Sequence, residues 1–253
     1  MQNNNMKTPI FKSLHSKAAK GLLAITIITL ASVTACKKDS NNSTSATVTE
    51  ADALELTTDA IEPTTGGMTI QANSSVTIYA SASTKLSCGI KKDTTISGAS
   101  VSGAIPSYSY SLSWNYRLDC DTNPQQFTFN FTGSSTYSGL LMSSNDSSTG
   151  TFLVATTPVA ANYTVNTSYE RKGTQTSKVG QKKGFTSDLK ITSNNVLISK
   201  ATNEIVSGTG TVSITGTTTG GKSFSFGGTI TFKGNKQATV VLNSGVSYPI
   251  QWN

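Results

Sequence analysis

Cys36 carries the most specific chemistry in this chain of 253 residues. It follows Val33-Thr34-Ala35 directly, at the end of an apolar run over 21–35, and four lysines but no acidic residue precede it. A basic start, a short apolar run and small residues before a cleavage point are typical of a secretory signal peptide. The run is shorter than the roughly 20 residues that span a bilayer. The segment resembles a lipobox, which predicts cleavage before Cys36 and acylation of its thiol.

The other two cysteines suit a disulfide bond. Cys88 and Cys120 form an even pair in a chain expected to reach an oxidising compartment. A bond between them would close a loop of about 32 residues and stabilise the fold by roughly 3–4 kcal/mol. The alternative is two buried thiols, because two cysteines alone make a poor metal site.

Removal of 1–35 changes the charge and the catalytic options. Four of the 20 basic residues leave with it, so the net charge falls from +7 to +3 and predicts no nucleic-acid partner. The only histidine, His15, leaves as well. The remaining chain has no Ser-His-Asp or Cys-His mechanism and no histidine-ligated zinc. We expect no cofactor and no metal.

Carboxylates give a weaker signal. Asp119, Asp121 and Asn123 match the opening of a calcium loop, but Pro124 replaces the required glycine and Asn130 the final glutamate. A turn explains the same residues. No other spacing singles out an acid and a nucleophile, so we expect no enzyme. A carboxylate-dependent glycan hydrolase is a remote alternative.

Five cations fall within thirteen residues that contain no acid. The segment 171–183 predicts a long basic hairpin loop, which would meet anionic glycans or lipid headgroups. A solvated loop is the alternative. The five residues are Arg171, Lys172, Lys178, Lys182 and Lys183.

An aromatic stripe accompanies this loop. Apolar and polar residues alternate strictly from Tyr108 to Leu118, which predicts a strand with one buried face, and 127–131 continues as its hairpin partner. Tyr108, Tyr110 and Trp114 would form the floor of a ligand site, with the basic loop as its rim. Core packing is the alternative interpretation of these aromatics.

The remaining chain predicts one helix and many strands. Thr49 is a suitable N-cap, and Pro63 with Gly66-Gly67 would end the helix. Period-two patterns and turn signals mark the strands. Besides 108–118 and 127–131, the expected strands are 68–72, 75–81, 136–142, 150–156, 161–170, 185–192, 195–199, 204–216, 222–233, 237–243 and 246–252.

These elements predict an all-β fold: an antiparallel meander of about twelve strands with one short N-terminal helix. A sheet of that width closes, curls or splits, so a barrel-like or sandwich domain is expected. A transmembrane barrel is a lesser alternative. The expected organisation is a signal peptide (1–35), a lipid-anchored flexible tether (36–48) and one domain (49–253), as a monomer.

The stretches from Val33 to Asp39 and from Gly208 to Trp252 resemble the all-β lipoproteins of the Bacteroidetes cell envelope. The resemblance implies an outer-membrane lipoprotein, periplasmic or surface-facing and held to the membrane by its lipid, but no activity. We therefore expect non-enzymatic binding of a lipid, glycan or envelope protein. A structural or adhesive surface module without a ligand cavity is the alternative.

Overall fold

The computed structural model describes residues 47–82, 86–121, 125–157, 159–180 and 182–252. The expected signal peptide, the acylation site Cys36 and residues 36–46 of the expected tether lie outside the described residues. Within them, two α-helices and one 3-10 helix precede a ten-stranded sheet. The helices are α1 (Glu50–Ile61), η1 (Pro63–Thr65) and α2 (Met68–Ala82).

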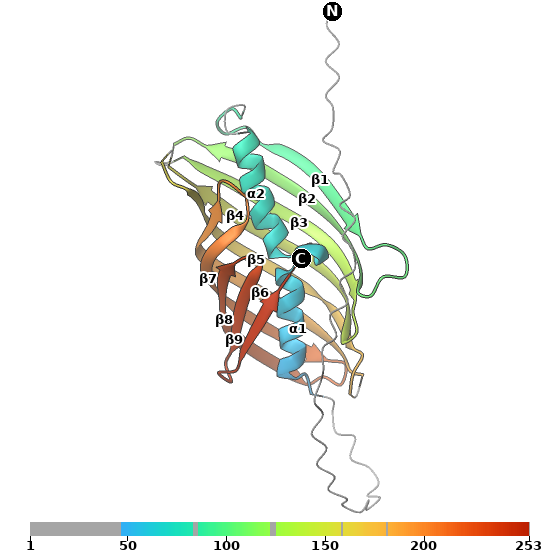
Figure 1. Ribbon diagram of the computed structural model, residues 1–253. Helices are drawn as coiled ribbons and strands as arrows, with labels where there is room; N and C mark the ends of the chain where they lie inside the picture. The colour runs from blue at the N-terminus through green and yellow to red at the C-terminus, as the bar shows by residue number, and fades with distance from the viewer. Residues whose placement is uncertain (1–46, 83–85, 122–124, 158, 181, 253) are drawn as a thin grey trace, which may run out of the picture. The chain divides into compact units, whose positions relative to one another are not determined.

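The strands form one sheet in sequence order, and each pairs antiparallel with the next. β1 and β10 are its edges, so the sheet is not closed into a barrel, and both helices lie against one face of it (Figure 1). The expected antiparallel meander is confirmed, but it has ten strands rather than about twelve, and the barrel-like or sandwich domain is an open single sheet that is not closed into a barrel. The strands are β1 (Lys92–Ala99), β2 (Ser107–Asp119), β3 (Gln126–Ser138), β4 (Met142–Ala155), β5 (Asn162–Ser177), β6 (Gly184–Ser199), β7 (Ile205–Thr218), β8 (Ser223–Gly234), β9 (Gln237–Leu242) and β10 (Ser247–Gln251).

Helix α1 begins where the sequence predicted. The Thr49 hydroxyl accepts from the Asp52 N–H at 3.3 Å, and the Asp52 carboxylate accepts from the Thr49 N–H at 2.7 Å. This reciprocal capping box satisfies two N–H groups that the first helical turn leaves free. The helix ends at Ile61, two residues before Pro63.

Helix α2 was missed, because 68–72 and 75–81 were expected to be strands. Its buried positions Met68, Ala72, Ser75 and Val76 recur at helical spacing and face the sheet. Several buried positions are polar, among them Gln71 and Ser75, so apolarity alone did not reveal the helical period. Gln71 is satisfied by the sheet: its Oε1 accepts from the Trp114 indole N–H at 2.9 Å.

Two polar stretches were wrongly expected to interrupt strands. Residues 145–147 lie inside β4, because the side chain of Asp146 points into the core and is paired there. Residues 185–192 and 195–199 form the single strand β6, which continues past an irregularity where Asn195 adopts a φ of 58°. Asparagine tolerates this left-handed conformation better than most residues.

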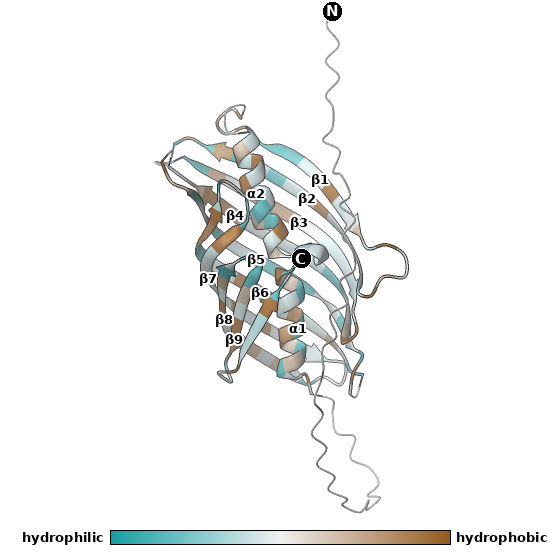
Figure 2. Cartoon of the chain, in the orientation of Figure 1, coloured by the Kyte–Doolittle hydropathy of each residue, from teal (hydrophilic) through white to brown (hydrophobic). Residues whose placement is uncertain are grey.

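The aromatic strand pair was predicted, but β3 is longer than the expected 127–131. The separate strand expected at 136–142 was wrong, because 136–138 end β3 and 139–141 form the turn to β4. β2 pairs with β3 so that Trp114 lies opposite Phe131 and Leu118 opposite Phe127. Phe127 and Phe129 are fully buried, and the Trp114 and Phe129 rings lie 5.4 Å apart. Burial alternates along the central part of both strands, as expected for one buried face, and brown, hydrophobic segments of the sheet stand among white and teal ones in Figure 2.

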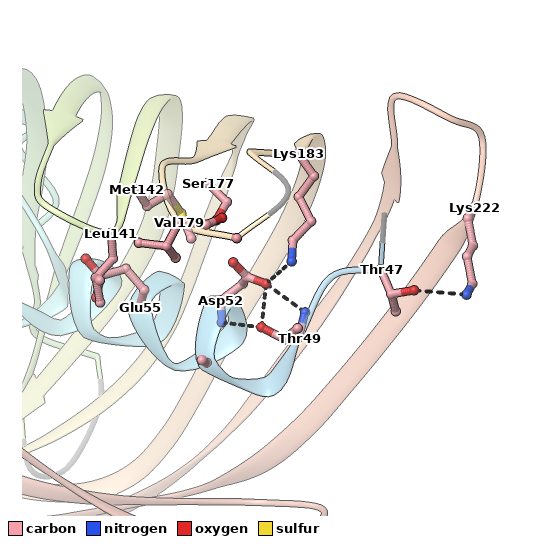
Figure 3. A pocket seen from close by; sticks show the side chains of 12 residues that line it. Thr47, Thr49, Asp52, Glu55, Leu141, Met142, Ser177, Val179, Lys183 and Lys222 are labelled. Carbon is pink, nitrogen blue, oxygen red and sulfur yellow. Dashed lines mark hydrogen bonds and ion pairs between the residues drawn. The ribbon is translucent and has the colours of Figure 1, made fainter. Parts of the chain in front are cut away.

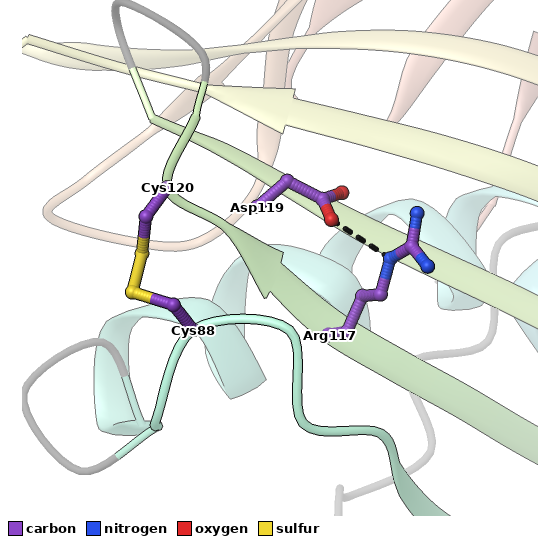
Figure 4. The surroundings of a disulfide bond; sticks show 4 residues. All are labelled: Cys88, Arg117, Asp119 and Cys120. Atoms are coloured by element: carbon purple, nitrogen blue, oxygen red, sulfur yellow. Dashed lines mark ion pairs between the residues drawn. A yellow bond between two sulfur atoms is a disulfide. The ribbon is translucent and has the colours of Figure 1, made fainter.

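The expected disulfide is present. Cys88 and Cys120 are bonded and lie 32 residues apart in the chain. The bond ties the segment before β1 to the end of β2, beside an ion pair of Arg117 and Asp119 at 2.8 Å (Figure 4). It therefore holds the open end of the β1–β2 hairpin together, at the start of the first edge strand.

Candidate functional site

The five expected loop cations do not share one loop. Arg171 and Lys172 belong to β5, so the loop after that strand covers only 178–183. Arg171 is buried at 5% exposure, where its guanidinium pairs with the Asp146 carboxylate at 2.8 Å and donates to the Asp59 carbonyl oxygen at 2.8 Å. Gln175 donates to the same carboxylate at 2.8 Å. Arg171 is thus a structural partner of α1 in this arrangement.

The other four cations have different surroundings and do not form one cluster. Lys172 pairs on the outer face with Glu170 at 2.8 Å. Lys178 donates to the Gly139 carbonyl oxygen, and Lys183 pairs with Asp52 of α1 at 2.7 Å. Lys182 is exposed at the tip of the loop. The expected basic rim is therefore reduced to residues 178–183, and its contact with a ligand remains a prediction.

The expected aromatic floor lies beneath the helices. Trp114 is 8% exposed and hydrogen-bonds α2, and Tyr110 is half-buried against the backbone of Gly66. Tyr108 lies near the end of β2 and is also half-buried. These aromatics pack in the core or at its margin, so a ligand would meet Trp114 only after α2 moved.

A groove of about 730 Å³ opens instead beside the first turns of α1 (Figure 3). Ala51, Asp52 and Glu55 form its helical wall. The β3–β4 and β5–β6 hairpins supply the facing wall, and Lys222 closes one end from the β7–β8 turn. The volume lies within the range of small-ligand sites.

Apolar side chains dominate the hairpin wall of the groove. Leu141 is 49% exposed and Val179 is 50% exposed, although both are large apolar residues. Met142 lines the groove beneath them, and the neighbouring Leu140 is 75% exposed. Contiguous exposed apolar surface of this kind marks interaction sites more often than isolated apolar residues do.

The charged residues of the groove differ in their hydrogen-bond and ion-pair partners. Burial raises the pKa of Asp52, but hydrogen bonds from Lys183 and Thr49 outweigh it and hold that pKa below its usual value. Burial raises the pKa of Glu55, offset in part by the hydroxyl that Tyr137 donates at 3.2 Å. Lys222 donates to the Thr47 hydroxyl at 3.2 Å, and among the described residues no carboxylate forms an ion pair with it.

A buried polar network adjoins the groove beneath α1. Asp59 is 3% exposed, and burial raises its pKa well above the usual value despite the nearby Arg171. Buried side-chain oxygens of Asp59, Ser144 and Gln175 have no hydrogen-bond partner among the described residues. Such atoms cost free energy in a dry interior, so the network supports α1 less well than apolar packing would.

The described carboxylates that the sequence suggested for calcium binding or catalysis do not form a shared site. Asp119 pairs with Arg117 and accepts from Thr128 at 2.7 Å, while Asp121 is exposed at the end of the hairpin. In the part of the chain that the structure describes, no group of three histidine, cysteine or acidic side chains is placed to hold a metal ion. Residues 122–124, which complete the calcium-like segment, lie outside that part.

No protein-family model, curated protein or solved structure matches the chain. The site is therefore interpreted from its own geometry. None of the described helices combines the length and apolar character needed to cross a membrane.

The sequence did not reveal the groove. Its one signal was Gly139-Leu140-Leu141-Met142, an apolar run at a hairpin turn, where polar residues are usual. The contribution of Glu55 depends on packing between α1 and β3, which are far apart in the sequence. Only the fold brings them together.

Proposed function

We propose that this protein binds one anionic lipid in the groove and performs no catalysis. The carrying observation is that Leu141 and Val179 remain exposed in a groove that Lys222 closes at one end (Figure 3). The ammonium group of Lys222 has no carboxylate partner among the described residues. An acyl chain would cover the apolar wall, and an acidic headgroup would pair with the lysine.

A lipid fits this wall better than a glycan does. Leucine, valine and methionine side chains offer no hydrogen bonds to sugar hydroxyls, which would lose water without compensation.

The expected position in the cell suits a lipid ligand. The disulfide fits an oxidising compartment outside the cytoplasm. Acylation of Cys36 would fix the chain to the outer membrane, on its periplasmic or its surface side. If the polar residues 36–46 form a flexible tether, they would span about 20 Å, and the folded domain would then be held within that distance of the bilayer.

A structural or adhesive module is the second candidate function. The observation favouring it is that α1 and α2 occupy the inner face of the sheet, where a larger ligand would otherwise lie (Figure 1). Such a module would bind no lipid in the groove, so the same experiment separates the two functions.

The test is co-flotation with vesicles of phosphatidylglycerol or of phosphatidylcholine. Cys36→Ser in the full-length chain prevents acylation. The apolar segment 21–35 is the same in every variant, so differences in binding between variants report the folded domain. In this background Val179→Asp should weaken binding to phosphatidylglycerol about tenfold, because it places a charge on the apolar wall. Val159→Asp is the matched control, since Val159 is 95% exposed on the β4–β5 turn, away from the groove.

Lys222→Glu should remove the preference for phosphatidylglycerol, whereas Lys236→Glu on the β8–β9 turn should leave it intact. Equal binding by all four variants, or no binding by the parent, would refute lipid binding in the groove. The second result would favour the structural module.

A further inference from the structure

The β10 edge of the open sheet is closed to further pairing. The Trp252 N–H donates to the Lys236 carbonyl at 3.1 Å, and the Leu242 N–H donates to the Val246 carbonyl at 3.3 Å. The backbone N–H and C=O groups of the even-numbered residues of β10 therefore point toward β9. The odd-numbered residues then direct their backbone groups outward. The middle one is Pro249, which has no N–H to donate. Proline at this position is a common protection of edge strands.

The β1 edge has no such protection. Ser100 N–H donates to the Tyr108 carbonyl at 2.9 Å, which places the even-numbered residues of β1 against β2. Its register with β2 runs without a shift, and no charged residue occurs between 94 and 107. The residues with outward backbone groups are Asp93, Thr95, Ser97 and Ala99.

Exposed apolar residues flank this edge at both ends. Ile90 is 51% exposed just before β1, and Val101 and Ile105 are 80% and 72% exposed just after it. The Cys88–Cys120 disulfide holds the start of the strand in place. β1 is thus a fixed strand with no net charge and with apolar neighbours, and no other described strand pairs with its outer edge. Such an edge is the usual template for strand addition.

We infer that β1 pairs antiparallel with β1 of a second copy of this chain, which joins the two sheets edge to edge. A two-fold register centred on Ile96 sets Thr95 opposite the partner's Ser97 and Ile96 opposite the partner's Ile96. Ile96 already packs at the margin of the core, so this register pairs two apolar, β-branched side chains.

Charge favours a second copy in this orientation. The charges of the segment, Lys91, Lys92 and Asp93, all lie at its first end. Antiparallel pairing sets them opposite neutral residues 99–101 of the partner, whereas parallel pairing would bring like charges together. Because Pro249 blocks the other edge, association stops at two copies, as a two-fold interface requires. This dimer replaces the monomer expected from the sequence, and it does not depend on the lipid groove.

The first test is the mass of the purified full-length Cys36→Ser chain by light scattering between about 1 and 100 μM. The expected result is twice the mass of one chain, with Thr95→Pro raising the dissociation constant about tenfold or more. Residue 95 directs its N–H outward, so the substitution spares the bonds to β2. Ile96→Lys should act similarly through repulsion across the axis, and Val206→Lys, on an exposed position of β7, should not.

The second test determines which residues of the two β1 strands lie opposite each other. In the same Cys36→Ser background, Ile96→Cys should form a disulfide-linked dimer under oxidation, because paired residues at the axis lie within bonding range. Thr94→Cys should not, since the register sets Thr94 opposite the partner's Gly98. Circular dichroism confirms folding of each variant. A monomer at every concentration, or equal crosslinking by both cysteine variants, would overturn the proposal.

Discussion

The two helices lie on unlike halves of the same sheet face. Helix α2 packs on rings: Tyr79 lies 5.6 Å from Phe127, and Trp114 beneath it lies 5.4 Å from Phe129. Helix α1 instead covers the Asp146–Arg171 pair and contributes a buried carboxyl group of its own, Asp59. Aromatic packing accounts for much of the contact between α2 and the sheet. Helix α1 also buries apolar residues, among them Leu56 and Ile61, but it lies over charges that must stay paired.

This difference indicates which part of the fold can change conformation at the lower free-energy cost. The aromatic half loses contacts with any displacement, because close-packed side chains leave no slack. The charged half contains unpartnered oxygens and borders the groove. We therefore expect α1 to open at lower free energy than α2, on the side where the ligand is proposed to bind.

The largest expected effect comes from breaking the charged half. Arg171→Met should lower the free energy of unfolding by about 3–5 kcal/mol, because it leaves the Asp146 carboxylate buried without its partner. Adding Asp146→Leu should restore most of the loss. Urea unfolding of both variants measures it. Lys172→Met, at an exposed ion pair on the outer face, should cost less than about 1 kcal/mol.

The aromatic half should lose a similar amount of stability, but no second substitution in the charged half should restore it. Phe129→Ala should cost about 3–4 kcal/mol in urea unfolding through lost burial and the cavity left behind. A second substitution in the charged half, such as Asp146→Leu, should not restore this lost stability. Leu140→Ala, on an exposed turn, serves as the control and should change stability by less than about 0.5 kcal/mol. A rescue of Phe129→Ala by Asp146→Leu would contradict the division into two halves.

The smallest effect is the pH dependence of α1. Burial raises the pKa of Asp59 above its usual 3.8, so the folded chain holds this proton more tightly than the unfolded chain. That contribution to stability is complete below 3.8 and is lost as the pH rises through the folded-state pKa. Asp59→Asn should therefore gain stability relative to the parent from pH 4 to pH 8 in urea unfolding.

The same contrast explains what the sequence could predict. The strand from Tyr108 to Leu118, the N-cap at Thr49 and the disulfide were predicted because local pattern and local chemistry agree there. Helix α2 and the middle of β4 were missed because they bury polar residues, which find partners only across the sheet. Nothing in the sequence indicated that Arg171 is buried while its basic neighbours in 171–183 are not, because its partner Asp146 lies 25 residues away in the chain.

The central claim is that one lipid occupies the groove. Native mass spectrometry of the full-length Cys36→Ser chain, incubated with phosphatidylglycerol, tests it most directly. We predict a single lipid adduct per chain in the parent and in Val159→Asp, and its loss in Val179→Asp. An adduct that persists in Val179→Asp, or several adducts bound equally by all three, would contradict binding in the groove.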